Sequence, residues 1–242
     1  MSFIQRFLTL IIYVVVLCIE LYVYVGVKEM FEAMRLYRGQ LPVELTYVRD
    51  YTLCWATVWN FMLQIFFLSL AILDEISRLL NLPSGLQKLL GKSRAYIFSS
   101  LVFPGSALVV FTFWSIWAVD RELIFPKIMD TFFPAWLNHV LHTFILIPLA
   151  IEILLPKTDN FIKFKSAAPT LLFYSGIYQV LYFLIYLRDG VWLYPVYKVL
   201  NIPQIFLFNL LQMFLILGFQ YLGISLQNTK MKKTEVGRKK VK

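Results

Sequence analysis

Six hydrophobic runs, each long enough to cross a bilayer, restrict the fold of this chain more than any other feature. A membrane-spanning helix needs about 20 consecutive, mostly apolar residues. The runs cover approximately residues 7–27, 51–73, 96–119, 133–155, 169–187 and 203–226. Hydrophobic residues make up 60% of the chain, against about 45–50% in soluble domains. We therefore predict an all-α, polytopic membrane protein, with a six-helix transmembrane bundle over residues 1–226 and a short basic tail over 227–242.

The lysine and arginine residues predict the orientation of this bundle. Cytoplasmic segments of membrane proteins are enriched in these residues. If the N-terminus is cytoplasmic, 15 basic residues fall on the cytoplasmic side and 8 on the other, and the tail supplies the difference. We expect both termini to be cytoplasmic. The first run could also be a signal peptide, but it is long and lacks a small-residue cleavage site, which favours a retained anchor helix.

The last four residues of the tail resemble a localisation signal. The chain ends with Lys239, Lys240, Val241 and Lys242, which fits the dilysine pattern that coat machinery reads in the cytosol. This pattern predicts the endoplasmic reticulum or another endomembrane, whereas a generic polybasic tail would leave the plasma membrane open. Because the net charge of +9 is concentrated in the tail, no nucleic-acid surface is expected.

A polar cluster lies inside the fourth run. Asn138, His139 and His142 include both histidines of the protein. Polar side chains within a membrane helix are costly, so they usually face the protein interior and mark function. Residues three and four apart share a helix face. Asn138 could therefore orient the His142 ring or donate to a developing oxyanion, with His139 on the flank.

The second run carries a matching polar stripe of Thr57, Asn60 and Gln64. Helices 2 and 4 run in the same direction, and a rise of about 1.5 Å per residue places Thr57 and His142 at similar depths. A hydroxyl beside an imidazole can act as a nucleophile, because the imidazole takes its proton. A site within reach of acyl chains would act on a lipid ester. The alternative is that these side chains are interhelical packing contacts.

The remaining polar residues suggest less chemistry. Asp120 and Arg121 follow the third run, either in a capped, salt-bridged turn or as a gate above the site. Two histidines on one helix cannot bracket a haem, and the cysteines have no metal-ligand spacing, so we expect no cofactor or metal. A transporter is disfavoured by the lack of repeats and broken helices.

Several motifs together resemble the androgen-induced protein family. They are Phe103–Pro104, Phe113–Trp114, the stretch from Asp120 to Lys127, and Pro134–Thr143, which contains Trp–Leu–Asn–His–x–x–His–Thr. The resemblance implies an atypical transmembrane threonine hydrolase, a carboxylic ester hydrolase that cleaves fatty acid esters of hydroxy fatty acids.

The resemblance also assigns residues. The family's threonine matches Thr57, which is followed by Gln64, Phe66 and Phe67, and its histidine matches His142. Thr57 is then the nucleophile and His142 the base. Supporting or substrate-binding roles fall to Asn60, Gln64, Asp120, Arg121, Asn138 and His139. A non-catalytic multi-pass membrane regulator or scaffold remains the alternative.

Overall fold

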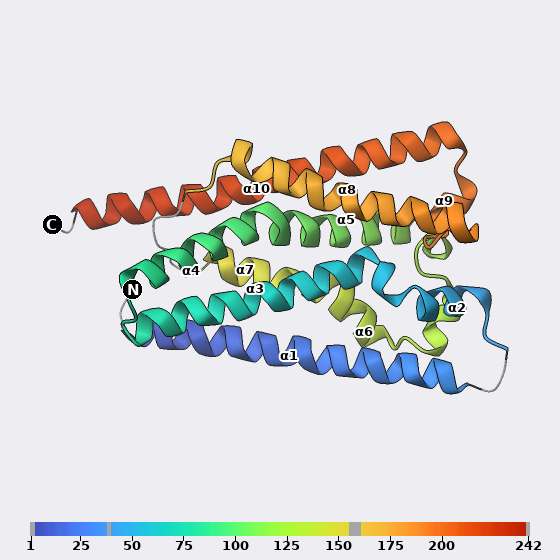
Figure 1. Cartoon of the computed structure of the whole chain (residues 1–242), viewed down its shortest axis with the longest axis horizontal. Coiled ribbons are helices and arrows are strands. Elements are labelled where there is room, and N and C mark those ends of the chain that lie inside the picture. The colour runs from blue at the N-terminus through green and yellow to red at the C-terminus, as the bar shows by residue number, and fades with distance from the viewer. Residues whose placement is uncertain (1–2, 38–39, 155–160, 241–242) are drawn as a thin grey trace.

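Long helices lying side by side make up the whole bundle in the computed structural model, which describes residues 3–37, 40–154 and 161–240 (Figure 1). No strand occurs in these ranges, and six helices are long and apolar enough to cross a membrane. The predicted fold class is therefore confirmed. The six are α1 (Phe3–Leu36), α3 (Ala56–Leu79), α4–η2–α5 (Ser84–Ile97, Phe98–Val102, Phe103–Val119), α6–η5–α7 (Ala135–His139, Val140–Phe144, Leu146–Leu154), α8 (Phe164–Asp189) and α10 (Ile202–Lys240).

Short helices close one end of the bundle. The connections contain α2 (Val43–Asp50), η1 (Thr52–Cys54), η3 (Arg121–Leu123), η4 (Lys127–Thr131) and α9 (Val196–Val199). Helices α2 and α9 lie at one end, here called the α2 end, whereas α1 starts and α10 finishes at the opposite, terminal end (Figure 1). Which end is cytoplasmic stays a prediction.

The basic tail is only partly described. Helix α10 continues through the predicted tail to Lys240. The side chains from Lys230 onward, and residues 241–242, lie outside the described part of the chain. The predicted dilysine signal at Lys239 and Lys240 falls there and stays a prediction.

The third span begins about three helical turns earlier than the hydropathy predicts, at Ser84 rather than near residue 96. Lys88 and Lys92 interrupt the apolar run, but their side chains are exposed, so the helix tolerates them. Arg94 faces inward and is buried. A buried arginine is costly unless carboxylates pair with it, and three such groups surround this one.

An ionic cluster, formed by Arg94, Asp74, Glu75, Glu152 and Tyr13, joins four helices at the terminal end. The Arg94 guanidinium lies 3.1 Å from an Asp74 oxygen and 2.8 Å from oxygens of Glu75 and Glu152. It also donates to the Tyr13 hydroxyl at 2.7 Å, and this hydroxyl donates to Glu152. The cluster therefore ties α1, α3, α4 and α7 together.

Two further arginines balance the charge of this cluster. Arg78 pairs with Asp74 at 2.8 Å, and Arg6 pairs with Glu75 at 3.3 Å. Three arginines thus face three carboxylates. Buried charges are tolerated when they are paired and hydrogen-bonded in this way.

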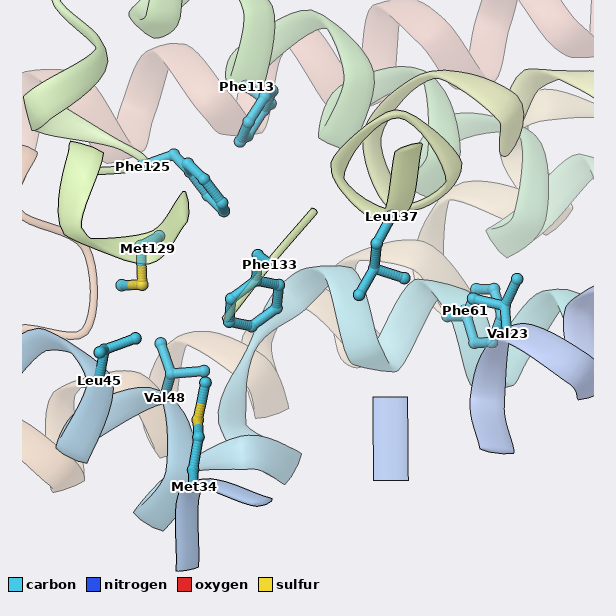
Figure 2. Close-up of a cluster of buried hydrophobic side chains, with 10 residues drawn as sticks. All are labelled: Val23, Met34, Leu45, Val48, Phe61, Phe113, Phe125, Met129, Phe133 and Leu137. Atoms are coloured by element: carbon cyan, nitrogen blue, oxygen red, sulfur yellow. The ribbon is translucent and has the colours of Figure 1, made fainter. Parts of the chain in front are cut away.

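A hydrophobic core positions α6 against its neighbours near the α2 end. Figure 2 shows ten of its buried side chains, which come from α1, α2, α3, α5, α6 and the segment that contains η4. They are Val23, Met34, Leu45, Val48, Phe61, Phe113, Phe125, Met129, Phe133 and Leu137. Because Phe61, Phe113 and Leu137 belong to one core, α3, α5 and α6 are held in fixed relative positions.

Gly223 is where α10 packs closely on α5, and it gives the first testable prediction. A Cβ at this position would lie 2.4 Å from a Phe103 ring carbon, whereas Gly218 has open space around it. Overpacking of this kind typically costs about 1–3 kcal/mol. We expect Gly223→Ala to lower the thermal unfolding midpoint of the detergent-solubilised protein.

Gly218→Ala is the matched control, because alanine is the better helix former by about 1 kcal/mol. It should unfold at the same or a higher temperature. Equal midpoints for the two variants would show that α10 does not press on Phe103.

Candidate active site

Thr57 and His142 lie in contact inside the bundle. The Thr57 Oγ1 and the His142 Nε2 are 3.3 Å apart. Thr57 is the second residue of α3, which begins at Ala56, and His142 lies in the middle of the fourth span. The two residues are 85 positions apart in the sequence, so their contact depends on the packing of α3 against the α6–η5 segment.

The partners of the imidazole define its tautomer. His142 Nδ1 lies 2.8 Å from the Asn138 side-chain oxygen and 3.1 Å from the Asn138 backbone carbonyl. Because a carbonyl oxygen can only accept, Nδ1 must carry the hydrogen. Neutral imidazole then has its lone pair on Nε2, which faces the Thr57 hydroxyl. The ring is thus set to accept the proton of that hydroxyl.

A π-helical turn, η5, carries His142. It covers Val140–Phe144 and interrupts the α-helical hydrogen-bonding pattern between α6 and α7. Short π-turns of this kind are frequent at functional sites. The indole of Trp114 donates to the His142 carbonyl at 2.9 Å and approaches the Thr143 hydroxyl at 3.1 Å. Trp114 therefore satisfies a backbone carbonyl in the widened turn.

The ring of Phe113 covers one face of the His142 imidazole. The rings of Phe113 and His142 are stacked, with centroids 3.7 Å apart and planes 11° from parallel. His142 is only 9% exposed. Because Asn138 bonds to His142 Nδ1 and Phe113 covers one face of the ring, the imidazole has little freedom to turn away from Thr57.

A second set of polar side chains, Asn60 and Gln64, lies one and two turns after Thr57 on α3. The side-chain nitrogen of Gln64 donates to the backbone carbonyl of Ile145 and to the Ser106 hydroxyl, each at 2.7 Å. The Ser106 hydroxyl donates in turn to the Asn60 side-chain oxygen at 2.9 Å. We call this chain of hydrogen bonds the amide relay. It links α3, α5 and Ile145, which lies between η5 and α7.

A cavity of about 860 Å³ opens beside the pair. Thr57, Asn60 and His142 line it together with many aromatic and aliphatic side chains. Helices α8 and α10 supply much of the opposite wall, including Tyr174 and Met213. The cavity is large enough for the reacting part of a lipid and is mostly apolar.

The other predicted site residues lie farther out. His139 is exposed, its ring stacks on Trp114 with centroids 5.3 Å apart, and its Nδ1 is 3.3 Å from the Thr143 hydroxyl. The Asp120 carboxylate caps the turn by accepting from the Glu122 backbone N–H at 2.9 Å. These contacts do not bring His139 or Asp120 to Thr57.

Arg121 belongs to the same turn as Asp120. Its guanidinium pairs with Asp130 at 2.9 Å and lies 4.4 Å from the centre of the Trp117 ring. These contacts fit the interpretation of this segment as a capped, salt-bridged turn; the alternative interpretation is a gate above the site. Among the described residues, no three His, Cys, Asp or Glu side chains are grouped as around a metal ion.

Sequence reasoning missed several residues of this site. Phe113, Trp114, Gly105 and Ser106 were not singled out as parts of it, although Phe113 and Trp114 occur in the motifs quoted above. The one available signal for Ser106 is a hydroxyl next to a glycine in the middle of an apolar run. The π-turn has no recognisable sequence signal.

Fold and site together define a multi-pass α-helical membrane protein with a threonine–histidine pair facing an apolar cavity. Its sequence matches the family model described as FAR-17a/AIG1-like protein over residues 8–228, so the chain belongs to the FAR-17a/AIG1 family. The resemblance that the motifs indicate is confirmed.

Named relatives agree with this assignment. The androgen-dependent TFPI-regulating protein of Homo sapiens is 34% identical over 188 residues, which cover 77% of this chain and 80% of the relative. That of Mesocricetus auratus is 34% identical over 64% of this chain and 66% of its own length. The androgen-induced gene 1 protein of Homo sapiens is 31% identical over 64% and 67% of the two chains. No solved structure matches.

Proposed function

We propose that this protein is an integral-membrane hydrolase of lipid esters, and that its substrates are fatty acid esters of hydroxy fatty acids. The observation that carries the proposal is the contact between the Thr57 hydroxyl and the unprotonated nitrogen of His142 at the wall of an apolar cavity. The substrate class comes from the family resemblance.

The proposed reaction has two steps. In the first, the Thr57 oxygen attacks the ester carbonyl while His142 Nε2 takes its proton, and the same proton then passes to the departing alkoxide. In the second, water attacks the acyl-threonine, again losing a proton to His142, and Thr57 is restored. A neutral amide beside the histidine, as with Asn138 here, also orients the base in papain-like proteases.

The cavity fits an acyl substrate in two respects. Its wall is mainly apolar, as an acyl chain requires. Some of its lining side chains are also exposed, among them Leu172 on α8 and Phe206 and Met213 on α10. Because α8 and α10 are long and apolar enough to cross a membrane, we infer that acyl chains enter the cavity from the bilayer past these residues.

The direct test is Thr57→Ala. Membranes that carry the variant should cleave a panel of lipid esters at background rate, because the alanine has no nucleophilic oxygen. A fluorophosphonate probe should label wild-type protein at Thr57 and leave the variant unlabelled. The assays are hydrolysis measured by mass spectrometry and peptide mapping of the labelled residue.

Thr46→Ala is the matched control. Thr46 lies on α2, where its hydroxyl bonds to the Pro42 carbonyl, so its loss should leave hydrolysis near the wild-type rate. Near-wild-type hydrolysis by Thr57→Ala would reject the proposal. It would favour a non-catalytic membrane regulator, a role suggested by the name of the TFPI-regulating relatives.

A further inference from the structure

We propose that the side-chain nitrogen of Asn60 is the oxyanion donor of this site, which binds the carbonyl oxygen of an ester as it becomes negatively charged. This inference rests on the proposed hydrolysis and deepens it. A nucleophile and a base are not sufficient for acyl transfer, because the tetrahedral intermediate carries an alkoxide. Hydrogen-bond donors aimed at this oxygen are usually the largest source of rate enhancement.

Asn60 has a free donor in the right place. It is 4% exposed, it lines the cavity together with Thr57, and its Nδ2 has no hydrogen-bond partner within the described part of the chain. Residues three apart on a helix are neighbours, with Cβ atoms about 5–6 Å apart. A buried amide that leaves its donor unpaired loses free energy, and a ligand oxygen in the cavity would provide the missing partner.

The amide relay determines which end of Asn60 is free. The Ile145 backbone carbonyl can only accept, so the Gln64 atom facing it must be the nitrogen. That same nitrogen donates to the Ser106 oxygen, which leaves the Ser106 hydrogen to point at Asn60. The Asn60 atom beside Ser106 must then be the oxygen, and the nitrogen is directed away from Ser106.

Gly105 provides the space for this arrangement. A Cβ on Gly105 would lie 3.2 Å from the Asn60 side-chain oxygen, closer than most such contacts. Glycine therefore allows Asn60 to approach α5 and reach Ser106. In addition, Thr57 lies in the first turn of α3, where the helix dipole favours negative charge, so the dipole and the amide act on the same oxygen.

A second unpaired donor also lines the cavity, the indole nitrogen of Trp55. Trp55 precedes Thr57 by two positions and lies just before α3, in extended backbone. Its ring packs edge-on against Tyr194, with centroids 5.0 Å apart. Trp55 is thus the competing candidate, and the experiment includes it.

The test compares kinetics of the purified full-length protein with a fatty acid ester of a hydroxy fatty acid as substrate. Asn60→Leu keeps the approximate shape but removes the donor. We expect kcat to fall about 10²–10³-fold, with little change in KM, and fluorophosphonate labelling of Thr57 to slow in parallel. Asn228→Ala is the control and should keep the wild-type kcat, because Asn228 does not line the cavity and donates instead to the Ile162 carbonyl.

The amide relay allows a measurement that distinguishes an oxyanion donor from a residue that only stabilises the fold. Ser106→Ala should lower kcat in the wild-type background, because it releases the Asn60 oxygen, and should lower it no further in Asn60→Leu. Gly105→Ala displaces Asn60 without removing it and should also lower kcat, which keeps the proposal testable if Asn60→Leu does not fold.

Two results would overturn the inference. One is an unchanged kcat in Asn60→Leu while Thr57→Ala is inactive, which would leave the proposed hydrolysis standing. The other is a loss of kcat confined to Trp55→Phe, which would identify Trp55 as the donor. Hydrolysis that persists in Thr57→Ala would instead reject the proposed function itself.

Discussion

His142→Ala is expected to reduce ester hydrolysis at least about 10³-fold, because general-base catalysis alone contributes roughly 10²–10⁴-fold and the Thr57 hydroxyl is a weak nucleophile without it. The ring is held by Asn138 and Phe113 in one tautomer and one orientation. No other base contacts the Thr57 hydroxyl in the described part of the chain. The rate is measured on isolated membranes with the lipid-ester panel.

The double variant Thr57→Ala/His142→Ala sharpens this prediction. Residues that act as one unit show strongly non-additive effects, so the double variant should be no slower than either single variant. His139→Ala is the matched control, because His139 is the other histidine of the chain and its ring stacks on Trp114 outside the contact with Thr57. Equal losses in the two histidine variants would contradict the assignment of the base.

Asn138→Ala should have a smaller effect than His142→Ala. The Asn138 backbone carbonyl still accepts from His142 Nδ1 at 3.1 Å, so the tautomer is retained and only the side-chain contact is lost. The ordering of these rates therefore tests whether Asn138 acts by positioning the ring.

The second large effect concerns stability. Arg94→Leu should destabilise the protein by about 3–5 kcal/mol, the usual cost of removing one partner from a buried ion pair. Asp74, Glu75 and Glu152 would lose the cation that they share. The measurements are the amount of protein that accumulates in membranes and the unfolding midpoint in detergent.

Arg188→Leu is the matched control for Arg94→Leu. Arg188 pairs with Asp189 at 2.7 Å, but its side chain is 74% exposed. Exposed ion pairs contribute about 0–1 kcal/mol, so this variant should accumulate normally. Similar losses for both arginines would mean that the ionic cluster is not the source of stability at the terminal end.

Hydropathy predicted the membrane-spanning helices well because six apolar runs are separated by polar connections. Hydropathy failed to predict the start of the third span, where a charged residue, Arg94, is buried inside the bundle. Lys88, Lys92 and Arg94 look like a loop between spans, yet they belong to a continuous helix that starts at Ser84. Arg94 can be buried there because it pairs with Asp74, Glu75 and Glu152, and these partners are distant in the sequence.

The Thr57–His142 contact could be anticipated, because helix direction and depth are simple functions of the sequence and the family motifs selected the same two residues. The surroundings of the pair could not. The π-turn depends on how Trp114 satisfies a carbonyl, and the amide relay depends on Ser106 meeting Gln64 across two helices. Such contacts follow from side-chain packing, which no spacing rule encodes. The catalytic roles of these residues stay predictions.

Different helices contribute the polar site residues and much of the apolar wall of the cavity. Thr57 and Asn60 stand on α3, Ser106 on α5 and His142 on η5, whereas α8 and α10 contribute wall side chains such as Tyr174 and Met213. Under the proposed hydrolase function, substitutions on α8 and α10 are expected to change which acyl chains fit the cavity without disturbing the contact between Thr57 and His142.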